Sequence, residues 1–272
     1  MAIQSIDQYL AAKKQRVLLA AYPGRTTGAG ANTFFGIRDI SVQPGALASL
    51  ASPNADPGAL VSGGSRNFPA LNTFQAGAKG YLSRFNVNSY DAVCVMVVDR
   101  LYDVGPLSLT GTAATFSLNG GVVSGIPNVL SRIPNGDASG CFIALEGLTL
   151  ASGNAAWNAT YTNESGVAGR STGNVQTTLQ IGRMFLLPLA NGDSGVQRLE
   201  SVTCTANITA QFNAGIFRPI FVDFVPGIAA VRDLFETGLP ELHQSSALEL
   251  WVAETSTTNP RHIEATLEIA NG

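Results

Sequence analysis

The stretch IEATLEI, residues 263–269, alternates apolar and polar side chains at every position. Successive side chains of a β-strand point to opposite faces of the sheet, whereas a helix would spread the same residues around its circumference. The alternation therefore predicts a strand with one buried face and one solvated face, and it directs Glu264 and Glu268 outward. Residues 157–162, 175–181 and 202–208 show the same period of two and predict three further strands.

Two continuous apolar runs predict strands that are buried on both faces: AVCVMVV at residues 92–98 and CFIAL at residues 141–145. Turn residues such as Asn119-Gly120-Gly121 and Asn191-Gly192-Asp193 separate the runs at hairpin-like intervals. The sequence thus predicts a mainly β protein, an antiparallel β-sandwich or jelly-roll with long irregular loops.

Helix signals are confined to two short segments. Ser5 followed by Gln8 predicts a capped N-terminal helix, and apolar side chains recur on one of its faces at Ile6, Tyr9 and Leu10. A second short helix is predicted over residues 231–237, with Gly238 ending it.

The composition changes to Gly, Pro, Ala, Ser and Asn between Tyr22 and Asn72, which predicts irregular loops or an extended arm. We therefore expect an N-terminal helix and loop-rich arm over residues 1–75 and a β-sandwich domain over residues 76–272. One continuous domain over residues 1–272 is the alternative.

Charge and composition exclude several classes of function. The chain has 272 residues with Lys+Arg 16 and Asp+Glu 19, a formal net charge of −3. A protein that binds duplex nucleic acid through counterion release needs a basic face, which this balance does not signal. Charged residues make up 13% and hydrophobic residues 45%. This combination argues against disorder and predicts a surface that is uncharged or covered by another molecule.

Targeting and cofactor signals are weak. The first 24 residues lack the basic start and apolar core of a secretion signal, and no apolar run approaches the length of a membrane span, so we expect a chain made in the cytoplasm. Cys94, Cys141 and Cys204 are far apart and lie in apolar runs, which predicts buried thiols and neither a metal site nor a cofactor.

The string Gly192-Asp193-Ser194-Gly195 resembles the sequence around the nucleophile of trypsin-like proteases. That family needs a histidine before the serine, but His243 and His262 both follow it here, and Val196 stands where the family has a second glycine. We therefore expect a hairpin loop and not a nucleophile.

Other chemical signals are equally thin. Gly28 and Gly30 resemble the start of a phosphate-binding loop but lack its lysine, so a plain loop is expected. The acid pairs Asp99/Asp103 and Glu264/Glu268 are expected to be solvated charges at strand ends or on strand faces. No enzymatic activity is predicted.

Arg183 and Arg218 lie among apolar residues, where an arginine needs a partner or access to the surface. Two interpretations stay open. Each could anchor the chain to another subunit, or could pair within the domain, for example Arg218 with Asp223.

The chain resembles small virion structural proteins of tailed double-stranded-DNA bacteriophages in several short strings along its length. These strings are Gly80-Tyr81-Leu82-Ser83-Arg84, residues 169–173, Gly182-Arg183-Met184 and residues 268–272. The resemblance implies a β-rich, non-enzymatic virion protein, first of all a capsid decoration (cement) protein that bridges major capsid protein subunits. A neck or tail component is an alternative.

The resemblance also implies partners. We expect a homo-oligomer, for example a trimer, that binds the major capsid protein or other virion proteins, without binding nucleic acid or membrane directly. The candidate interface residues are Arg183, Arg218, Tyr9, Leu10, Phe34 and Phe35. A second alternative is a carbohydrate- or receptor-binding virion module that uses Trp157 and Tyr161, whose aromatic rings share one strand face.

Overall fold

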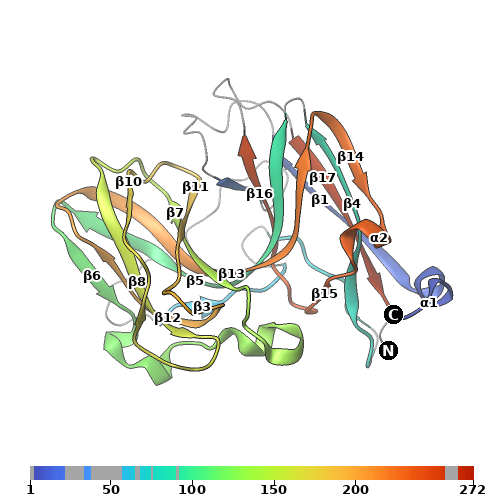
Figure 1. Ribbon diagram of the computed structural model, residues 1–272, viewed down its shortest axis with the longest axis horizontal. Coiled ribbons are helices and arrows are strands. Elements are labelled where there is room, and N and C mark those ends of the chain that lie inside the picture. The colour runs from blue at the N-terminus through green and yellow to red at the C-terminus, as the bar shows by residue number, and fades with distance from the viewer. Residues whose placement is uncertain are drawn as a thin grey trace.

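Two long strands, β5 (Val93–Thr110) and β13 (Thr209–Val225), pair antiparallel and run through both halves of the molecule (Figure 1). The computed structural model describes residues 3–21, 34–37, 57–64, 68–74, 76–89, 92–254 and 263–272. All strand pairs in these ranges are antiparallel, so the predicted mainly β, antiparallel class with a short N-terminal helix is confirmed.

Six strands form a closed ring at the centre of the molecule. The hydrogen-bonded order is β13–β7–β11–β2–β16–β5, and β5 pairs again with β13. This makes a small barrel whose other members are β7 (Phe142–Gly147), β11 (Arg183–Leu187), β2 (Phe34–Ile37) and β16 (Leu248–Glu254). The two-residue strand β3 (Ala59–Leu60) pairs with β5 from outside the ring.

A further sheet flanks the barrel on each side. One has the order β10–β8–β12–β6 with β9 on β8, where the strands are β10 (Val175–Thr177), β8 (Ala155–Asn163), β12 (Val196–Cys204), β6 (Ala114–Ser117) and β9 (Arg170–Ser171). The other has the order β1–β17–β4–β14 with β15 on β4, where the strands are β1 (Lys13–Ala21), β17 (Ile263–Asn271), β4 (Gly80–Ser89), β14 (Ile228–Arg232) and β15 (Glu241–Leu242).

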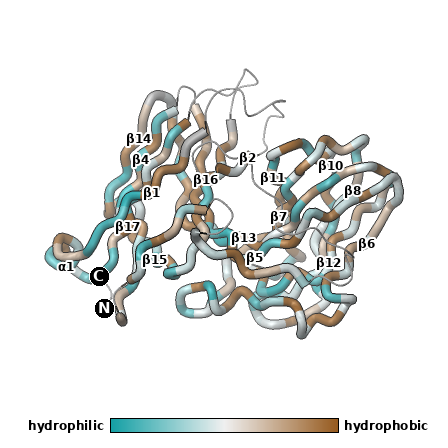
Figure 2. The backbone as a smooth tube through the Cα atoms, turned by 180° about the vertical axis from the view of Figure 1, so that it is seen from behind, coloured by the Kyte–Doolittle hydropathy of each residue, from teal (hydrophilic) through white to brown (hydrophobic). Residues whose placement is uncertain are grey.

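Each flanking sheet packs on the barrel wall as one half of a sandwich. The core against β8 and β12 contains Trp157, Tyr161 and Phe212. The core against β4 and β17 contains Phe85 and Leu267 together with barrel residues of β5 and β16. Figure 2 shows apolar and polar residues alternating along these strands, as a sheet with one buried face requires.

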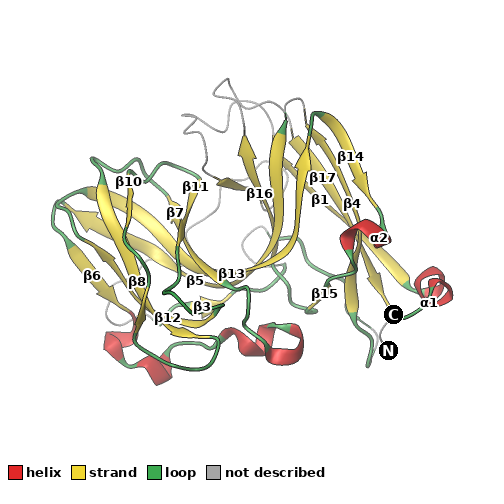
Figure 3. Cartoon of the chain, viewed as in Figure 1, coloured by secondary structure: helices red, strands yellow, loops and turns green. Residues whose placement is uncertain are grey.

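The helices are short, as Figure 3 shows. Helix α1 (Ile6–Ala11) starts at Ser5, whose hydroxyl accepts a hydrogen bond from the Gln8 N–H, so the predicted cap is confirmed. Helix α2 (Leu234–Thr237) is shorter than the predicted segment because Val231 belongs to β14, and Gly238 ends it with φ 69°. The 3₁₀ turns are η2 (Leu118–Gly121), η3 (Val123–Gly125), η4 (Val129–Arg132) and η5 (Pro134–Gly136).

Three local predictions need correction. Residues 13–21, expected to lie in the loop-rich arm, form strand β1, which pairs with β17 along its whole length. The alternation over residues 202–208 does not form one strand, because β12 ends at Cys204 and β13 begins at Thr209. The strand predicted over residues 175–181 ends at Thr177.

Some predictions fall partly outside the described residues. Most of the segment 22–72, including Gly28 and Gly30, lies outside the described residues. Residues 34–37 of this segment form β2, one of the strands of the barrel wall. The division into two domains at residue 75 stays a prediction. Cys141 and Cys204 are buried and Cys94 is half-buried, all as free thiols.

The fold predicts the effect of removing Trp157, which is fully buried with its ring 5.0 Å from that of Phe212. Trp157→Ala leaves a cavity and is expected to lower the free energy of unfolding by about 3–5 kcal/mol. Chemical denaturation followed by circular dichroism measures this change. Val167→Ala, at an exposed site, is the control and is expected to stay within about 0.5 kcal/mol of the parent. Equal stabilities of the two variants would contradict this packing.

Candidate functional site

The protease-like string forms a structural turn. Gly192 has φ 91°, and the Asp193 carboxylate accepts hydrogen bonds from the Tyr161 hydroxyl at 2.6 Å and from Arg170 Nε at 2.8 Å. These donors, with the Asn163 amide, lower the pKa of Asp193 to about 2. The Ser194 N–H donates to Glu164, and His243 bonds to Ser245 and Ser246 in another part of the chain. The string is a loop, but the predicted hairpin is wrong, because β11 and β12 belong to different sheets. The loop ties β8 to the β11–β12 connection.

The largest cluster of ionisable side chains lies inside the fold. Arg100 of β5 is fully buried and bonds to three carboxylates on three barrel strands. It contacts Glu249 at 3.1 Å through Nε, and Asp103 and Glu146 at 3.0 Å through Nη1. The Phe217 ring centroid lies 4.6 Å from its guanidinium carbon. Although burial disfavours the charged guanidinium, these carboxylates, Glu249 foremost, raise the pKa of Arg100 above its usual value.

The expectation that Asp99 and Asp103 are solvated is wrong, because both are buried. Asp99 accepts hydrogen bonds from Ser246 Oγ at 2.6 Å and the Ala247 N–H at 2.8 Å, and Arg132 Nη2 lies 3.4 Å away. The partners of Asp99 come from distant segments of the chain, whereas Asp103 pairs with Arg100 on its own strand. Asp99 therefore fastens β5 to the β15–β16 connection. Glu264 and Glu268 are half-buried.

The candidate residues Arg183 and Phe35 come together within this chain. They are register partners on β11 and β2, and the Arg183 guanidinium lies 5.4 Å from the Phe35 ring centroid. Both are buried, so they close the barrel seam and leave little surface for a partner. Phe34, the next residue of β2, is half-buried with its ring 5.8 Å from that of Trp251.

Arg218 is half-buried, and its Nη2 donates to the Glu241 carbonyl at 2.6 Å. The suggested pairing with Asp223 is wrong, because Asp223 pairs with Arg232 at 3.0 Å instead. Burial lowers the pKa of Arg218 despite the neighbouring Asp99. Arg218 thus holds the start of the β15–β16 region, as Arg132 holds its middle through the Ser245 carbonyl.

Trp157 and Tyr161 cannot stack on a sugar in this fold. Both side chains are fully buried in the core between β8 and the barrel. The Tyr161 hydroxyl is engaged by Asp193, and burial together with this bond raises the pKa of Tyr161 to about 12. The pair therefore serves packing.

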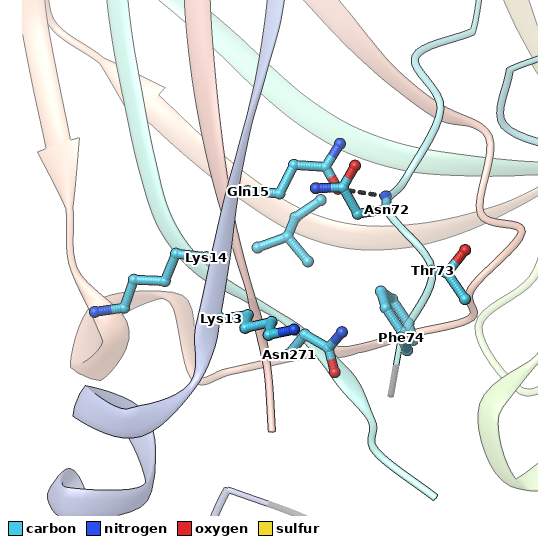
Figure 4. Close-up of a pocket in the computed structure, with 8 residues that line it drawn as sticks. Lys13, Lys14, Gln15, Asn72, Thr73, Phe74 and Asn271 are labelled. Atoms are coloured by element: carbon cyan, nitrogen blue, oxygen red, sulfur yellow. Dashed lines mark hydrogen bonds between the residues drawn. The ribbon is translucent and has the colours of Figure 1, made fainter. Parts of the chain in front are cut away.

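A small cavity lies where β1 meets residues 72–74 (Figure 4). Its volume is about 50 Å³, and Lys13, Gln15 and Asn271 are among the residues around it. The Gln15 amide accepts from the Asn72 N–H at 2.6 Å and donates to the Ala70 carbonyl at 2.8 Å. The cavity is too small for an organic substrate, and Gln15 acts as a tether for the segment beside it.

The larger hollow, about 400 Å³, lies between α1 and α2. We call it the α1–α2 groove; it is lined by Ile3, Gln4, Ser5, Ile6, Tyr9, Leu234, Phe235, Gly238 and Leu239. Its apolar side chains are open to solvent: Ile6 is 59% exposed and Phe235 73%. Leu10, beside it on α1, is 66% exposed, so two of the interface residues predicted from the sequence, Tyr9 and Leu10, lie at this groove.

The sequence pointed to the α1 half of this groove but not to the α2 half. Tyr9 is held by its hydroxyl, 3.1 Å from Glu268, and by Lys14 Nζ, 4.1 Å from its ring centroid. Asp233 caps α2, and Phe235 lies in the first turn of that helix. A capped short helix with an apolar residue in its first turn is the sequence feature that could have identified the α2 half.

Two kinds of site are not found among the described residues. No group of three His, Cys, Asp or Glu side chains there is arranged to hold a metal ion. None of the helices in the same ranges is long and apolar enough to cross a membrane.

Comparison with known proteins gives only distant likenesses. No protein-family model and no curated protein matches the chain. A solved structure of the infectious bursal disease virus Gt strain is 10% identical, with 96% of this chain and 81% of that chain covered and a TM-score of 0.22. The VP2 subviral particle of the same virus is 10% identical, with 95% and 81% covered and a TM-score of 0.19. At this level the likeness carries no conclusion about fold or function.

The Arg100 cluster predicts a large loss of stability when Arg100 is replaced. Arg100→Met leaves buried carboxylates without the guanidinium and is expected to cost about 3–5 kcal/mol in unfolding free energy. Lys79→Met breaks the partly exposed Lys79–Glu241 pair and is expected to cost much less, because water screens such a pair. Thermal and urea unfolding compare the two variants, and a cost for Arg100→Met as small as that for Lys79→Met would show that the cluster does not hold the barrel.

His243 predicts a pH dependence. Its Nδ1 accepts the Ser245 N–H at 3.1 Å, and burial, with Arg132 and Arg218 nearby, lowers its pKa below 6.5 although Asp99 opposes this. The unfolded chain therefore binds a proton more readily, so stability falls as the pH drops below about 6.5. His243→Asn, which keeps an acceptor but does not titrate, is expected to reduce this loss in urea unfolding between about pH 7.5 and 5.5. Identical pH profiles would contradict the assignment.

Proposed function

We propose that this chain is a non-enzymatic virion structural protein and, within that class, a capsid decoration (cement) protein that bridges and stabilises major capsid protein subunits. The support comes from the resemblance of its short sequence strings to virion structural proteins of tailed phages and from the distribution of its side chains. The ionisable side chains that could do chemistry are engaged inside the fold, and large apolar side chains are exposed instead.

The observation that carries the proposal is the presence of exposed apolar side chains on both sides of the central barrel. Beyond β8 and β12 they lie in connections between strands, at Val122, Leu150, Val167 and Ile181. On the opposite side they lie at the α1–α2 groove, where α1 and α2 sit at the far end of the molecule (Figure 1). Leu150 precedes β8 and Val167 follows it, so this side of the molecule offers apolar side chains at both ends of β8 for contact with other proteins.

A bridging role needs two contact surfaces held at a fixed separation. The barrel supplies the spacing, because β5 and β13 run through both sandwiches and Arg100 ties three of the barrel strands together. Each contact is small, but repetition around a closed symmetry gives high overall avidity on a particle. Such a protein would strengthen a shell by cross-linking neighbours, without any chemical step.

The test is to mix the purified chain with undecorated phage heads and to follow binding by co-sedimentation and electron microscopy. We expect a regular array on the head surface and heads that withstand heating better. The double variant Leu150→Asp/Val167→Asp is expected to lose binding, whereas Thr112→Asp, also on an exposed connection, keeps it. A chain that neither binds nor stabilises heads contradicts decoration, and binding to necks or tails instead would reassign its position on the particle.

A further inference from the structure

We infer that the α1–α2 groove is a self-association surface, where a second copy of this chain docks through a two-fold contact. The inference concerns the chain alone, and the contact would form whether or not the protein decorates a capsid.

The apolar part of this surface has both a projection and a hollow. Phe235 extends from α2 into solvent, 73% exposed, and the groove beside it holds about 400 Å³. None of the nine residues that line the groove carries a charge. A two-fold contact requires a surface that is complementary to itself, and a projecting ring next to an apolar hollow meets this requirement.

The backbone around the hollow is held in an unusual shape. Leu239 has φ 50°, in the left-handed region that residues other than glycine rarely adopt, and it directly follows Gly238 at φ 69°. Conformations of this kind cost energy and persist where the surrounding structure fixes them, often at binding surfaces. Here Thr237 Oγ1 donates to the Leu82 carbonyl at 3.1 Å, which fastens the end of α2 to β4 and keeps the hollow open.

Charges on the flanks favour a second copy over other partners. Asp7 of α1, and Asp233 and Glu236 at the start of α2, are exposed acids next to the groove. Lys14, which follows α1 in the chain, is an exposed base whose Nζ lies 4.1 Å from the ring centroid of Tyr9. The flanks thus carry charges of both signs, so a copy rotated by two-fold symmetry can place Asp7 opposite Lys14. A strongly acidic or strongly basic partner would meet repulsion on one flank.

The exposed apolar residues of β13 do not offer a comparable site. Val222 and Phe224 are also exposed on β13, but there the Asp223 carboxylate accepts the Phe224 N–H at 2.9 Å and pairs with Arg232. A charged pair of this kind hinders the approach of another strand edge. The α1–α2 groove has no such protection.

Sedimentation velocity over a range of concentrations tests the inference on the full chain without any particle. We expect a concentration-dependent dimer whose association constant falls at least about 30-fold in Phe235→Asp, the effect of removing an aromatic anchor. Leu150→Asp adds the same charge at an exposed apolar site on the other sandwich and is expected to leave the dimer intact. A dimer or trimer that persists in Phe235→Asp, or a chain that stays monomeric throughout, overturns the inference.

A pair of charge variants tests the two-fold arrangement itself. Asp7→Lys makes the flank that carries Asp7 and Lys14 basic, and Lys14→Glu makes the same flank acidic. Each variant alone is expected to dimerise less than the parent, and an equal mixture is expected to form heterodimers. The four side chains changed in these tests, Phe235, Leu150, Asp7 and Lys14, are exposed, so unchanged circular dichroism spectra are expected. Absence of heterodimers in the mixture would contradict the two-fold contact even where the parent dimerises.

Discussion

The antiparallel pairing of β5 with β13 is the constraint on which the rest of the structure depends. The pairing runs from Thr209–Thr110 to Val225–Val93 and shifts register at three places along β13. Shifts of this kind bend a strand pair and increase its twist. Because of these bends, one pair of strands contributes to the core against β8, to the barrel interior and to the core against β4. The two sandwiches are therefore parts of one continuous framework.

The buried charged side chains have a structural role in this framework. Removing charges from water is costly, and a buried ion pair often contributes little net stability compared with an apolar replacement. Arg100, however, connects β5 with β7 and β16, and so fixes which strands meet around the barrel. Gly36 of β2 makes room for this arrangement, because a Cβ there would overlap with the Glu249 carboxylate. We interpret the cluster as a device that specifies how the ring closes, with the seam completed by Arg183 over Phe35.

Local pattern predicted much of the fold. The alternation over residues 263–269 identified β17, the apolar run over residues 92–98 identified the start of β5, and Ser5 with Gln8 identified α1. Pattern failed where distant residues decide the outcome. Asp99 looks like a solvated acid because its partners Arg132 and Ser246 are far along the chain. The ring closure was equally hidden, because β2 has only four residues and depends on β11 and β16 for its place.

The central claim is that this protein acts through its outer surfaces while its ionisable residues hold the fold. Hydrogen–deuterium exchange, compared between the free chain and the assembled particle or oligomer, tests that claim most directly, since it reports where backbone amides gain protection. The account predicts added protection in residues 3–11 and 234–239 and in the connections that carry Leu150 and Val167, with little change at residues 99–103, 146 and 249, which are already buried. Protection gained at the Arg100 cluster alone, with none at α1, α2 or those connections, would contradict it.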